Sequence, residues 1–395
     1  MEERQKISIS NLFFYLVIIE IVIGGSGRLI EFGSLSLKML FYIVAIFISF
    51  FSLKKIQLNE VFHLQVIFLL IICLGFVFAA FNNAPIELIL EDIKPLTFMF
   101  ISSYIAINIK SLHNIKVVSF LIKYSSLLMG IIYILIVIGL HLGVINFSAF
   151  YQQQSENSEI FFRGEKFFFY KGFLYLGIGF IFFVTSKSFK DQILAFILFT
   201  ALCLTLTRGF ILAASLVYFY YIFFVNKGYF LKFFALILGC ISLIYLLPIL
   251  LDTLGNKSDS DLVRFLTFDE VVEEINFGST FFGHGFGIGV ESRPIHMEIS
   301  FLEIFHKQGI IGLLFWFGLL AYLIVKFKTI RSNDLKKIGL PYLLSVFFVY
   351  IQSFTNPFVN NPIGISILMI AFIVILRLNG LTNDRLSMIK YDGKI

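Results

Sequence analysis

Runs of roughly twenty apolar residues recur along the whole chain, and each run is long enough to cross a lipid bilayer as an α-helix. Hydrophobic residues make up 58% of the chain, and charged residues make up only 14%. Soluble domains usually contain about 25% charged residues. The sequence therefore predicts an all-α, polytopic membrane protein and excludes a water-soluble globular domain.

The apolar runs correspond to about twelve predicted membrane spans. Their approximate ranges are 10–25, 35–53, 61–81, 88–109, 117–140, 167–186, 191–207, 209–225, 230–250, 309–327, 338–356 and 362–379. Neither a Ser/Gly-rich linker nor an acidic tail separates them, so we expect a single integral membrane domain, 1–395. The first run resembles the later ones, which argues against a cleaved signal peptide.

The positions of lysine and arginine predict how the spans are oriented. If the N-terminus is inside, every predicted inside segment contains basic residues, whereas the outside connections 82–87 and 355–361 contain none. Basic residues concentrate on the cytoplasmic side of membrane proteins. We therefore expect both termini in the cytoplasm of a bacterial inner membrane. The two long external loops are then at about 141–166 and 251–308, the second lying between spans nine and ten.

The net charge of +6 comes largely from these short basic loops, so it indicates membrane orientation and no nucleic-acid partner. Membrane lipid is the partner that the composition predicts. The cysteines Cys73, Cys203 and Cys240 lie inside apolar runs and lack Cys-x-x-Cys spacing. They predict neither a disulfide nor a zinc site.

On the predicted external side the positive-inside rule gives no reason to keep arginine, and four arginines there are the main cases. They are Arg163, Arg208, Arg264 and Arg293. The planar guanidinium group binds phosphate oxygens through two parallel hydrogen bonds, so several such residues indicate an anionic ligand. On the membrane face away from ATP, that ligand would be a lipid-linked phosphate or pyrophosphate.

Arg208 and Arg264 carry the strongest of these signals, and each has a plainer alternative. Arg208 lies in LTLTRGF, between two apolar runs, and a charge at the membrane boundary usually lines a cavity or meets a partner. It could instead be a snorkelling side chain that ends a helical hairpin. Arg264 lies in a predicted amphipathic helix, KSDSDLVRFLTFDEVVEEINF. Its alternative is an ion pair with a nearby acid, Asp261, Asp269 or Glu270.

The segment 278–316, GSTFFGHGFGIGVESRPIHMEISFLEIFHKQGIIGLLFW, collects glycines, histidines and carboxylates before a further span. The polar positions after Pro294 recur with helical spacing and predict a helix that ends at Gly309. His296 and Glu298 at its start are candidates for proton transfer. His296 could alternatively cap or decorate an interfacial helix. GHGFGIG lacks both the spacing and the βαβ context of a dinucleotide loop.

The other two histidines of this segment, His284 and His306, are expected to be structural. They lie in GHG and in EIFHKQG, respectively. Neither is accompanied by cysteines or by a carboxylate cluster that would demand a metal ion.

Several of these segments resemble the O-antigen polymerase and O-antigen ligase superfamily, bacterial membrane glycosyltransferases of the GT-C type. TRG at 207–209 is similar to the family's Ser/Thr-Arg-Gly, and FFGHGFGIG at 281–289 is similar to its Gly-x-Gly-x-Gly turn. HMEISFLEIFHKQGIIGLLFW at 296–316 is similar to its histidine motif, which ends in Gly-(Ile/Leu)-x-Gly. The chain departs from the family where His-Asn becomes His-Met-Glu, and where Phe265-Leu266 replaces a tryptophan or leucine run.

The resemblance implies a GT-C-like fold and a reaction on undecaprenyl-pyrophosphate-linked oligosaccharides at the periplasmic face. Arg208 and Arg264, together with Arg163 and Arg293, would then bind the donor pyrophosphate. His296 would orient or deprotonate the acceptor hydroxyl, with Glu298 beside it. The resemblance implies no cofactor and no catalytic metal, and it allows a chain-length regulator as a partner. Polymerisation of repeat units is favoured, and the alternatives are ligation to lipid A-core and flipping of the lipid-linked oligosaccharide.

Overall fold

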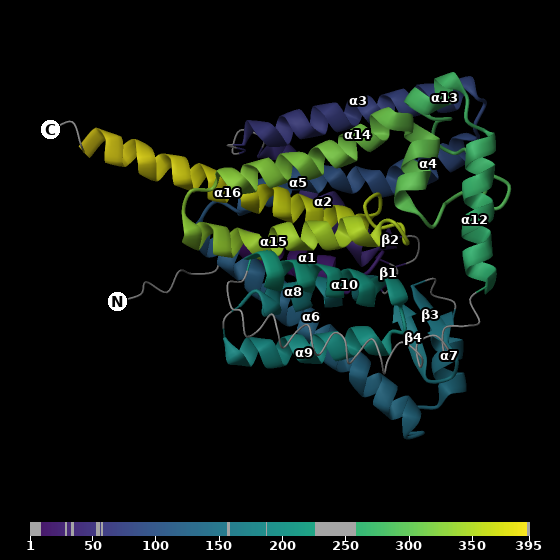
Figure 1. Ribbon diagram of the computed structural model, residues 1–395, viewed down its shortest axis with the longest axis horizontal. Coiled ribbons are helices and arrows are strands. Elements are labelled where there is room, and N and C mark those ends of the chain that lie inside the picture. The colour runs from purple at the N-terminus through teal and green to yellow at the C-terminus, as the bar shows by residue number, and fades with distance from the viewer. Residues whose placement is uncertain are drawn as a thin grey trace.

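The computed structural model describes residues 9–27, 30–32, 35–52, 56, 58–155, 159–186, 188–225 and 258–392. Most of these residues are helical (Figure 1). The helices are α1 (Ile9–Ile23), α2 (Leu37–Phe51), α3 (Asn59–Phe81), α4 (Ile86–Leu96), α5 (Ile101–Asn108), α6 (Leu112–His141), α7 (Phe147–Ser155), α8 (Leu174–Val184), α9 (Phe189–Leu204), α10 (Arg208–Tyr220), α12 (Ser258–Glu273), α13 (Phe277–Phe282), α14 (Ser300–Thr329), α15 (Asn333–Gln352) and α16 (Pro362–Asp392). Shorter turns are the 3-10 segments η2 (Thr97–Phe100) and η3 (Lys171–Phe173) and the π-helical segment η4 (Tyr221–Val225).

Within the described part of the chain, five helices are long and apolar enough to cross a membrane. They are Asn59–Phe81, Leu112–His141, Arg208–Val225, Ser300–Thr329 and Pro362–Leu381. Three shorter apolar helices accompany them, at Ser10–Ile23, Leu37–Phe51 and Lys171–Val184. The architecture agrees with the predicted all-α membrane protein. The predicted ninth span, 230–250, lies outside the described residues.

Helix α16 forms the centre of the bundle. In the most apolar 18-residue window of Pro362–Leu381, 83% of the residues are buried, compared with 22% in the corresponding window of α14. Its side chains from Ile367 to Leu376 are all at most 3% exposed. A helix that is apolar on every side is buried in a protein core or spans a membrane. Accordingly α16 contacts α14, α15 and α5.

The predicted fourth span, 88–109, is not one continuous helix. It forms α4, then the 3-10 turn η2, then α5. Pro95 lies at the end of α4 and has no backbone N–H to donate, so the regular helical hydrogen-bond pattern is interrupted there. The Tyr42 hydroxyl donates a 2.7 Å hydrogen bond to the Thr97 carbonyl within the interrupted stretch.

The predicted sixth span, 167–186, was wrong at its N-terminal end. Residues Phe167–Tyr170 form strand β4, which pairs antiparallel with β3 (Ile160–Arg163), and α8 begins only at Leu174. Aromatic residues fit strands well, and the turn between the strands contains Gly164 at φ 66°. A second short hairpin pairs β1 (Glu31–Phe32) with β2 (Leu35–Ser36).

Helix α14 is bent at Gly309, where φ is 63° and ψ is −160°. The bend frees the carbonyls of His306 and Lys307 from the helical ladder. The N–H groups of His284 and Gly285 donate to these carbonyls at 2.8 and 3.1 Å. The predicted helix after Pro294 begins later than expected, at Ser300, so His296 lies in the preceding loop.

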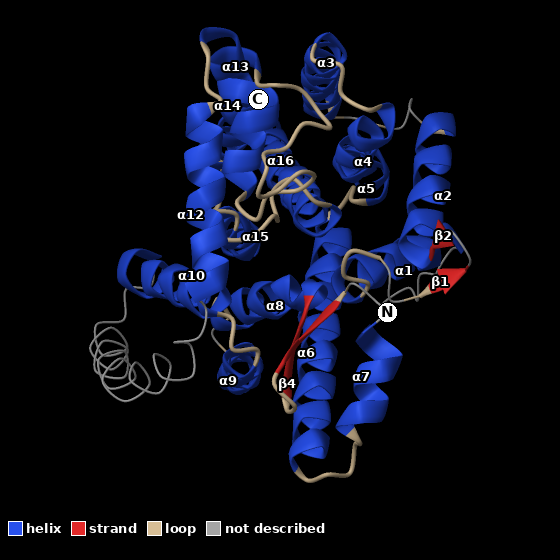
Figure 2. Cartoon of the chain, turned by 90° about the vertical axis from the view of Figure 1, so that its right-hand side faces the viewer, coloured by secondary structure: helices blue, strands red, loops and turns tan. Residues whose placement is uncertain are grey.

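The long loops gather at one end of the helical body. Figure 1 shows α7, β3, β4, α12 and α13 at the right-hand end, whereas α16 ends at the opposite side. In Figure 2, which faces that end, α12 extends along it between α13 and α10. The helix predicted in the long loop is confirmed as α12, but its apolar residues Leu262, Phe265 and Leu266 are exposed. The fold therefore brings the loops 141–166 and 258–308 to the same face.

Candidate functional site

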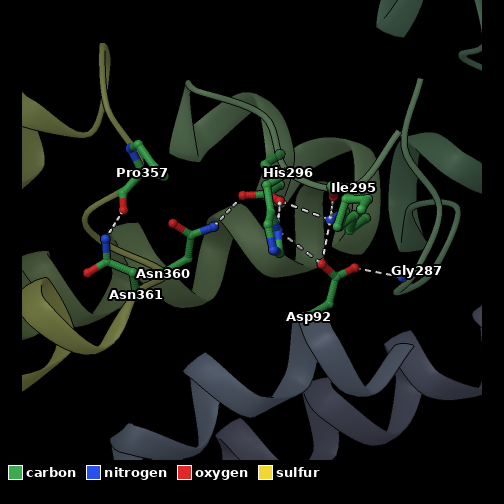
Figure 3. A network of polar contacts seen from close by, with 9 residues as sticks. Asp92, Gly287, Ile295, His296, Pro357, Asn360 and Asn361 are labelled. Atoms are coloured by element: carbon green, nitrogen blue, oxygen red, sulfur yellow. Dashed lines mark hydrogen bonds and ion pairs between the residues drawn. The ribbon is translucent and has the colours of Figure 1, made fainter. Parts of the chain in front are cut away.

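A buried ion-pair network lies where α4 meets the beginning of α14 (Figure 3). The ammonium of Lys307 lies 2.7 Å from Asp92 Oδ1 and 2.9 Å from Glu303 Oε1. It also donates to the Ile295 carbonyl at 2.6 Å. The second carboxylate oxygen of Asp92 accepts the Gly287 N–H at 2.6 Å. These three charged side chains are at most 7% exposed, so the network is compact and excludes solvent.

His296 lies at the edge of this network. Its Nδ1 is 3.4 Å from both Glu303 Oε1 and Asp92 Oδ1, while its side chain remains 51% exposed. The hydrogen bond to Glu303 raises the pKa of His296 above its ordinary value, and burial opposes this rise. A carboxylate on Nδ1 fixes the imidazole tautomer, which leaves Nε2 free to accept a proton. His296 is therefore the side chain of this cluster that a ligand in solvent can reach.

Asp92, His296 and Glu303 have the donor types of a metal site, and their ligand atoms all lie within 4.8 Å of one another. However, the ammonium of Lys307 already lies between the two carboxylates. It supplies the positive charge that a metal ion would bring. Lys307 thus offsets part of the negative charge of Asp92 and Glu303 without a metal ion.

The turn between α15 and α16 connects this cluster to the TRG segment. Asn360 Nδ2 donates to Glu303 Oε2 at 2.7 Å, and the Ser300 N–H donates to the Ser353 carbonyl at 3.1 Å. On its other side, Gln352 Nε2 donates to the Gly209 carbonyl at 2.5 Å. A Cβ on Gly209 would come 2.9 Å from Thr355 Oγ1, so the turn packs tightly against TRG. Residues 352–361 therefore contact both the TRG segment and Glu303, the acid beside His296.

Arg208 and Arg163 lie near one another at the tight connection between α9 and α10. Arg208 is the first residue of α10 and its side chain is exposed. Arg163, at the end of β3, donates through Nη1 to the carbonyl of Leu206. Burial lowers the pKa of Arg163, and the positive charge of Arg208 lowers it further. The two guanidinium groups therefore lie close enough for their positive charges to interact.

The other two predicted arginines meet at a single carboxylate. Arg264 Nε is 2.7 Å from Glu298 Oε2, and Arg293 Nη2 is 2.5 Å from Glu298 Oε1. These side chains, with Thr267, line a small, shallow hollow that opens to solvent. Glu298 thus lies between the arginines, at the position where an anionic ligand would bind them. Of the predicted alternative partners of Arg264, Glu270 instead accepts from Ser292 at 2.6 Å. The side chain of Asp261 lies outside the described residues.

The predicted site residues thus fall into three groups, at His296, at Arg163 with Arg208, and at Arg264 with Arg293 and Glu298. Sequence reasoning missed the network residues Asp92, Glu303 and Lys307 and the amide Asn360. Glu303 and Lys307 did carry a signal, since an acid and a base four residues apart lie on one helical face. Asn360 carried none, because its contact joins residues 57 positions apart.

Helices long and apolar enough to cross a membrane, together with arginines and a histidine at or between their ends, indicate a polytopic membrane protein with a candidate anion site. No protein-family model matches the chain. The chain is 32% identical over 373 residues to an O-antigen polymerase of Shigella flexneri, an alignment that covers 91% of this chain and 93% of the relative. The chain belongs to the O-antigen polymerase family.

Proposed function

We propose that the protein polymerises lipid-linked oligosaccharide repeat units into O-antigen or a related surface polysaccharide. The observation that carries this proposal is the turn 352–361, which contacts both the Arg208 segment and the acid that orients His296. A cationic donor site and a candidate base are thereby held together. The similarity to an O-antigen polymerase over nearly the whole chain supports the same reaction.

The substrate is an oligosaccharide linked to undecaprenyl pyrophosphate, and the reaction takes place on the periplasmic face of the inner membrane. About twelve spans, in a single GT-C-like domain with both termini in the cytoplasm, are consistent with the basic residues of the inside loops. The gathering of the loops 141–166 and 258–308 at one end supports a common external face for them. A chain-length regulator would meet the protein in the same membrane.

Arg208 and Arg163 bind the donor pyrophosphate, and Arg264 and Arg293 contribute further positive charge to the same face. Guanidinium groups stabilise the negative charge that develops on the leaving pyrophosphate. The exposed side chain of Arg208 and the solvent-open hollow at Arg264 make both accessible to a headgroup. Glu298 positions the second pair and gives it a carboxylate that a phosphate could replace.

In the reaction, the acceptor hydroxyl attacks C1 of the donor sugar and the bond from C1 to the pyrophosphate oxygen breaks. The leaving pyrophosphate takes the electron pair, and the configuration at C1 inverts. His296 Nε2 takes the proton of the acceptor hydroxyl, while Glu303 and Asp92 hold Nδ1. The arginines supply the charge stabilisation, so this scheme needs no metal at the reacting centre.

The function is tested by deleting the gene and separating the cell-surface polysaccharide on a gel. We expect lipid A-core that carries a single repeat unit, and restoration of the polymer ladder by the wild-type gene. Lipid-linked polymer together with bare core would instead identify a ligase. Loss of all surface glycan would identify a flippase.

The pH dependence of polymerisation should report the environment of His296. Glu303 raises the pKa of His296 above 6.5. A general base must be unprotonated, so activity should fall as the pH drops through this raised pKa. Replacing Glu303 with glutamine removes the charge, so the acidic limb of the rate profile should move to lower pH. The measurement is the polymerisation rate against pH in reconstituted membranes.

Glu91→Gln is the matched control for this experiment, because Glu91 is exposed on α4 directly before Asp92. In this control the acidic limb of the rate profile should stay at the wild-type pH. If the acidic limb of the rate profile does not move in Glu303→Gln, then His296 is not the general base.

A further inference from the structure

His306 is buried without a hydrogen-bond partner. The residue is 2% exposed, and within the described part of the chain neither of its ring nitrogens has a hydrogen-bond partner. A buried polar group without a partner destabilises the fold, because it has lost its hydrogen bonds to water. Most such groups in native proteins are satisfied, and an exception often marks an ion or water that binds there. The ion-pair network described above does not use this side chain.

Two further metal-ligand side chains face His306. Its Nε2 is 3.8 Å from Glu274 Oε2, and its ring centroid is 4.6 Å from that of His284, at an interplanar angle of 31°. The ligand atoms of all three side chains lie within 4.8 Å of one another. Glu274 directly follows α12, His284 lies in the glycine-rich turn, and His306 lies on α14. Three separate segments therefore supply one compact donor set.

The backbone holds the two histidines in fixed positions. The His284 N–H donates to the His306 carbonyl at 2.8 Å, and Asn82 Nδ2 donates to the His284 carbonyl at 2.8 Å. The turn approaches so closely that a Cβ on Gly283, which has φ 75°, would lie 2.3 Å from the carbonyl carbon of Lys307. The two histidines are thus held together by one main-chain hydrogen bond and supported by one from the Asn82 side chain, and neither bond depends on a ligand. This preorganises the donor set.

The chemistry of the donors selects the ligand. Two imidazoles and one carboxylate suit Zn²⁺ and similar divalent first-row ions, which accept three protein ligands and one water. The Asp92–His296–Glu303 group differs, because the ammonium of Lys307 lies between its carboxylates. At His306 no such internal cation is present among the described residues, since the adjacent Lys307 is engaged by Asp92 and Glu303.

We propose that Glu274, His284 and His306 bind one divalent transition-metal ion, with Zn²⁺ as the best match. The ion joins the end of α12, the glycine-rich turn and α14. Figure 1 shows α13, which lies between α12 and the turn in the chain, against the beginning of α14. The ion thereby fixes the loop that carries Arg264, Arg293 and His296. This role is structural and departs from the sequence-based expectation of no metal.

The test uses the full-length protein, purified in detergent through a histidine-free affinity tag and stripped with a chelator. Titration with Zn²⁺, and with Co²⁺ followed by its visible absorption, should give about one ion per chain. His306→Ala should abolish this binding. Glu274→Gln alters an exposed side chain and keeps its shape, so it tests the site without disturbing the core. It should weaken binding at least about tenfold.

His63→Ala, which removes an exposed histidine on α3, is the matched control and should bind as the wild type does. Chelation should lower the melting temperature of the wild type and the control, and leave that of Glu274→Gln nearly unchanged. Absence of stoichiometric binding in the wild type would overturn the proposal. So would binding that Glu274→Gln leaves unchanged, because the metal would then be held elsewhere.

Discussion

Replacing Lys307 with methionine is expected to destabilise the protein by about 3–5 kcal/mol, because it leaves two buried carboxylates without their positive partner. Lys307 is 3% exposed and lies within 3 Å of both Asp92 and Glu303. Removing one member of a buried ion network costs more than the network itself contributes, since the remaining charges stay desolvated. The melting temperature of the purified protein in detergent should fall by several degrees.

Lys328→Met is the control for this experiment, because Lys328 is exposed near the other end of the same helix. It should melt as the wild type does. Adding Asp92→Asn and Glu303→Gln to Lys307→Met removes the unpaired charges and should recover part of the loss. A single Lys307→Met variant that melts at the wild-type temperature would show that the network is not a stability element.

Replacing Arg208 with alanine is expected to reduce polymerisation at least about 100-fold, which is the usual effect of removing one preorganised group that stabilises developing negative charge. Arg208→Lys should also be strongly impaired, because an ammonium cannot form the two parallel hydrogen bonds of a guanidinium. The side chain is exposed at the start of α10, so the fold should be unaffected. The length distribution of the surface polysaccharide measures the activity, and the melting temperature checks the fold.

Arg331→Ala provides the matched control, because Arg331 is exposed at a predicted cytoplasmic turn. It should leave the polymer ladder intact. A full ladder from Arg208→Ala, at normal protein levels, would remove Arg208 from the proposed donor site. Arg208 would then be the snorkelling residue that its position also allows.

Apolar runs and basic loops predicted the helical class and most helix positions, because hydrophobicity and charge act locally along the chain. The breaks inside those runs were not predicted. The Phe167–Tyr170 stretch is as apolar as a membrane helix, and its pairing with Ile160–Arg163 depends on a partner strand. The interruption at Pro95 had a local signal, but hydropathy alone does not register a missing N–H donor.

The sequence indicated the individual candidate residues but not the contacts that join them. The unusual positions of Arg208, Arg264 and His296 were visible because each is polar or charged in an apolar chain. Their partners were not, since Glu298 meets Arg264 across 34 positions and Asp92 meets Lys307 across 215. Such contacts follow from tertiary packing. The assignment of Glu298 as a catalytic partner of His296 remains a prediction, and the structure places its carboxylate with the arginines.

The bend of α14 at Gly309 divides this helix into a short first part and a longer apolar part. A Cβ at Gly309 would lie 2.4 Å from the backbone of Phe281, so α13 is packed directly against the bend and prevents it from opening. The bend is therefore a fixed corner and not a hinge. Glu303 and Lys307 lie on the part of α14 before this corner, so the corner sets the direction in which they project from the apolar part of the helix.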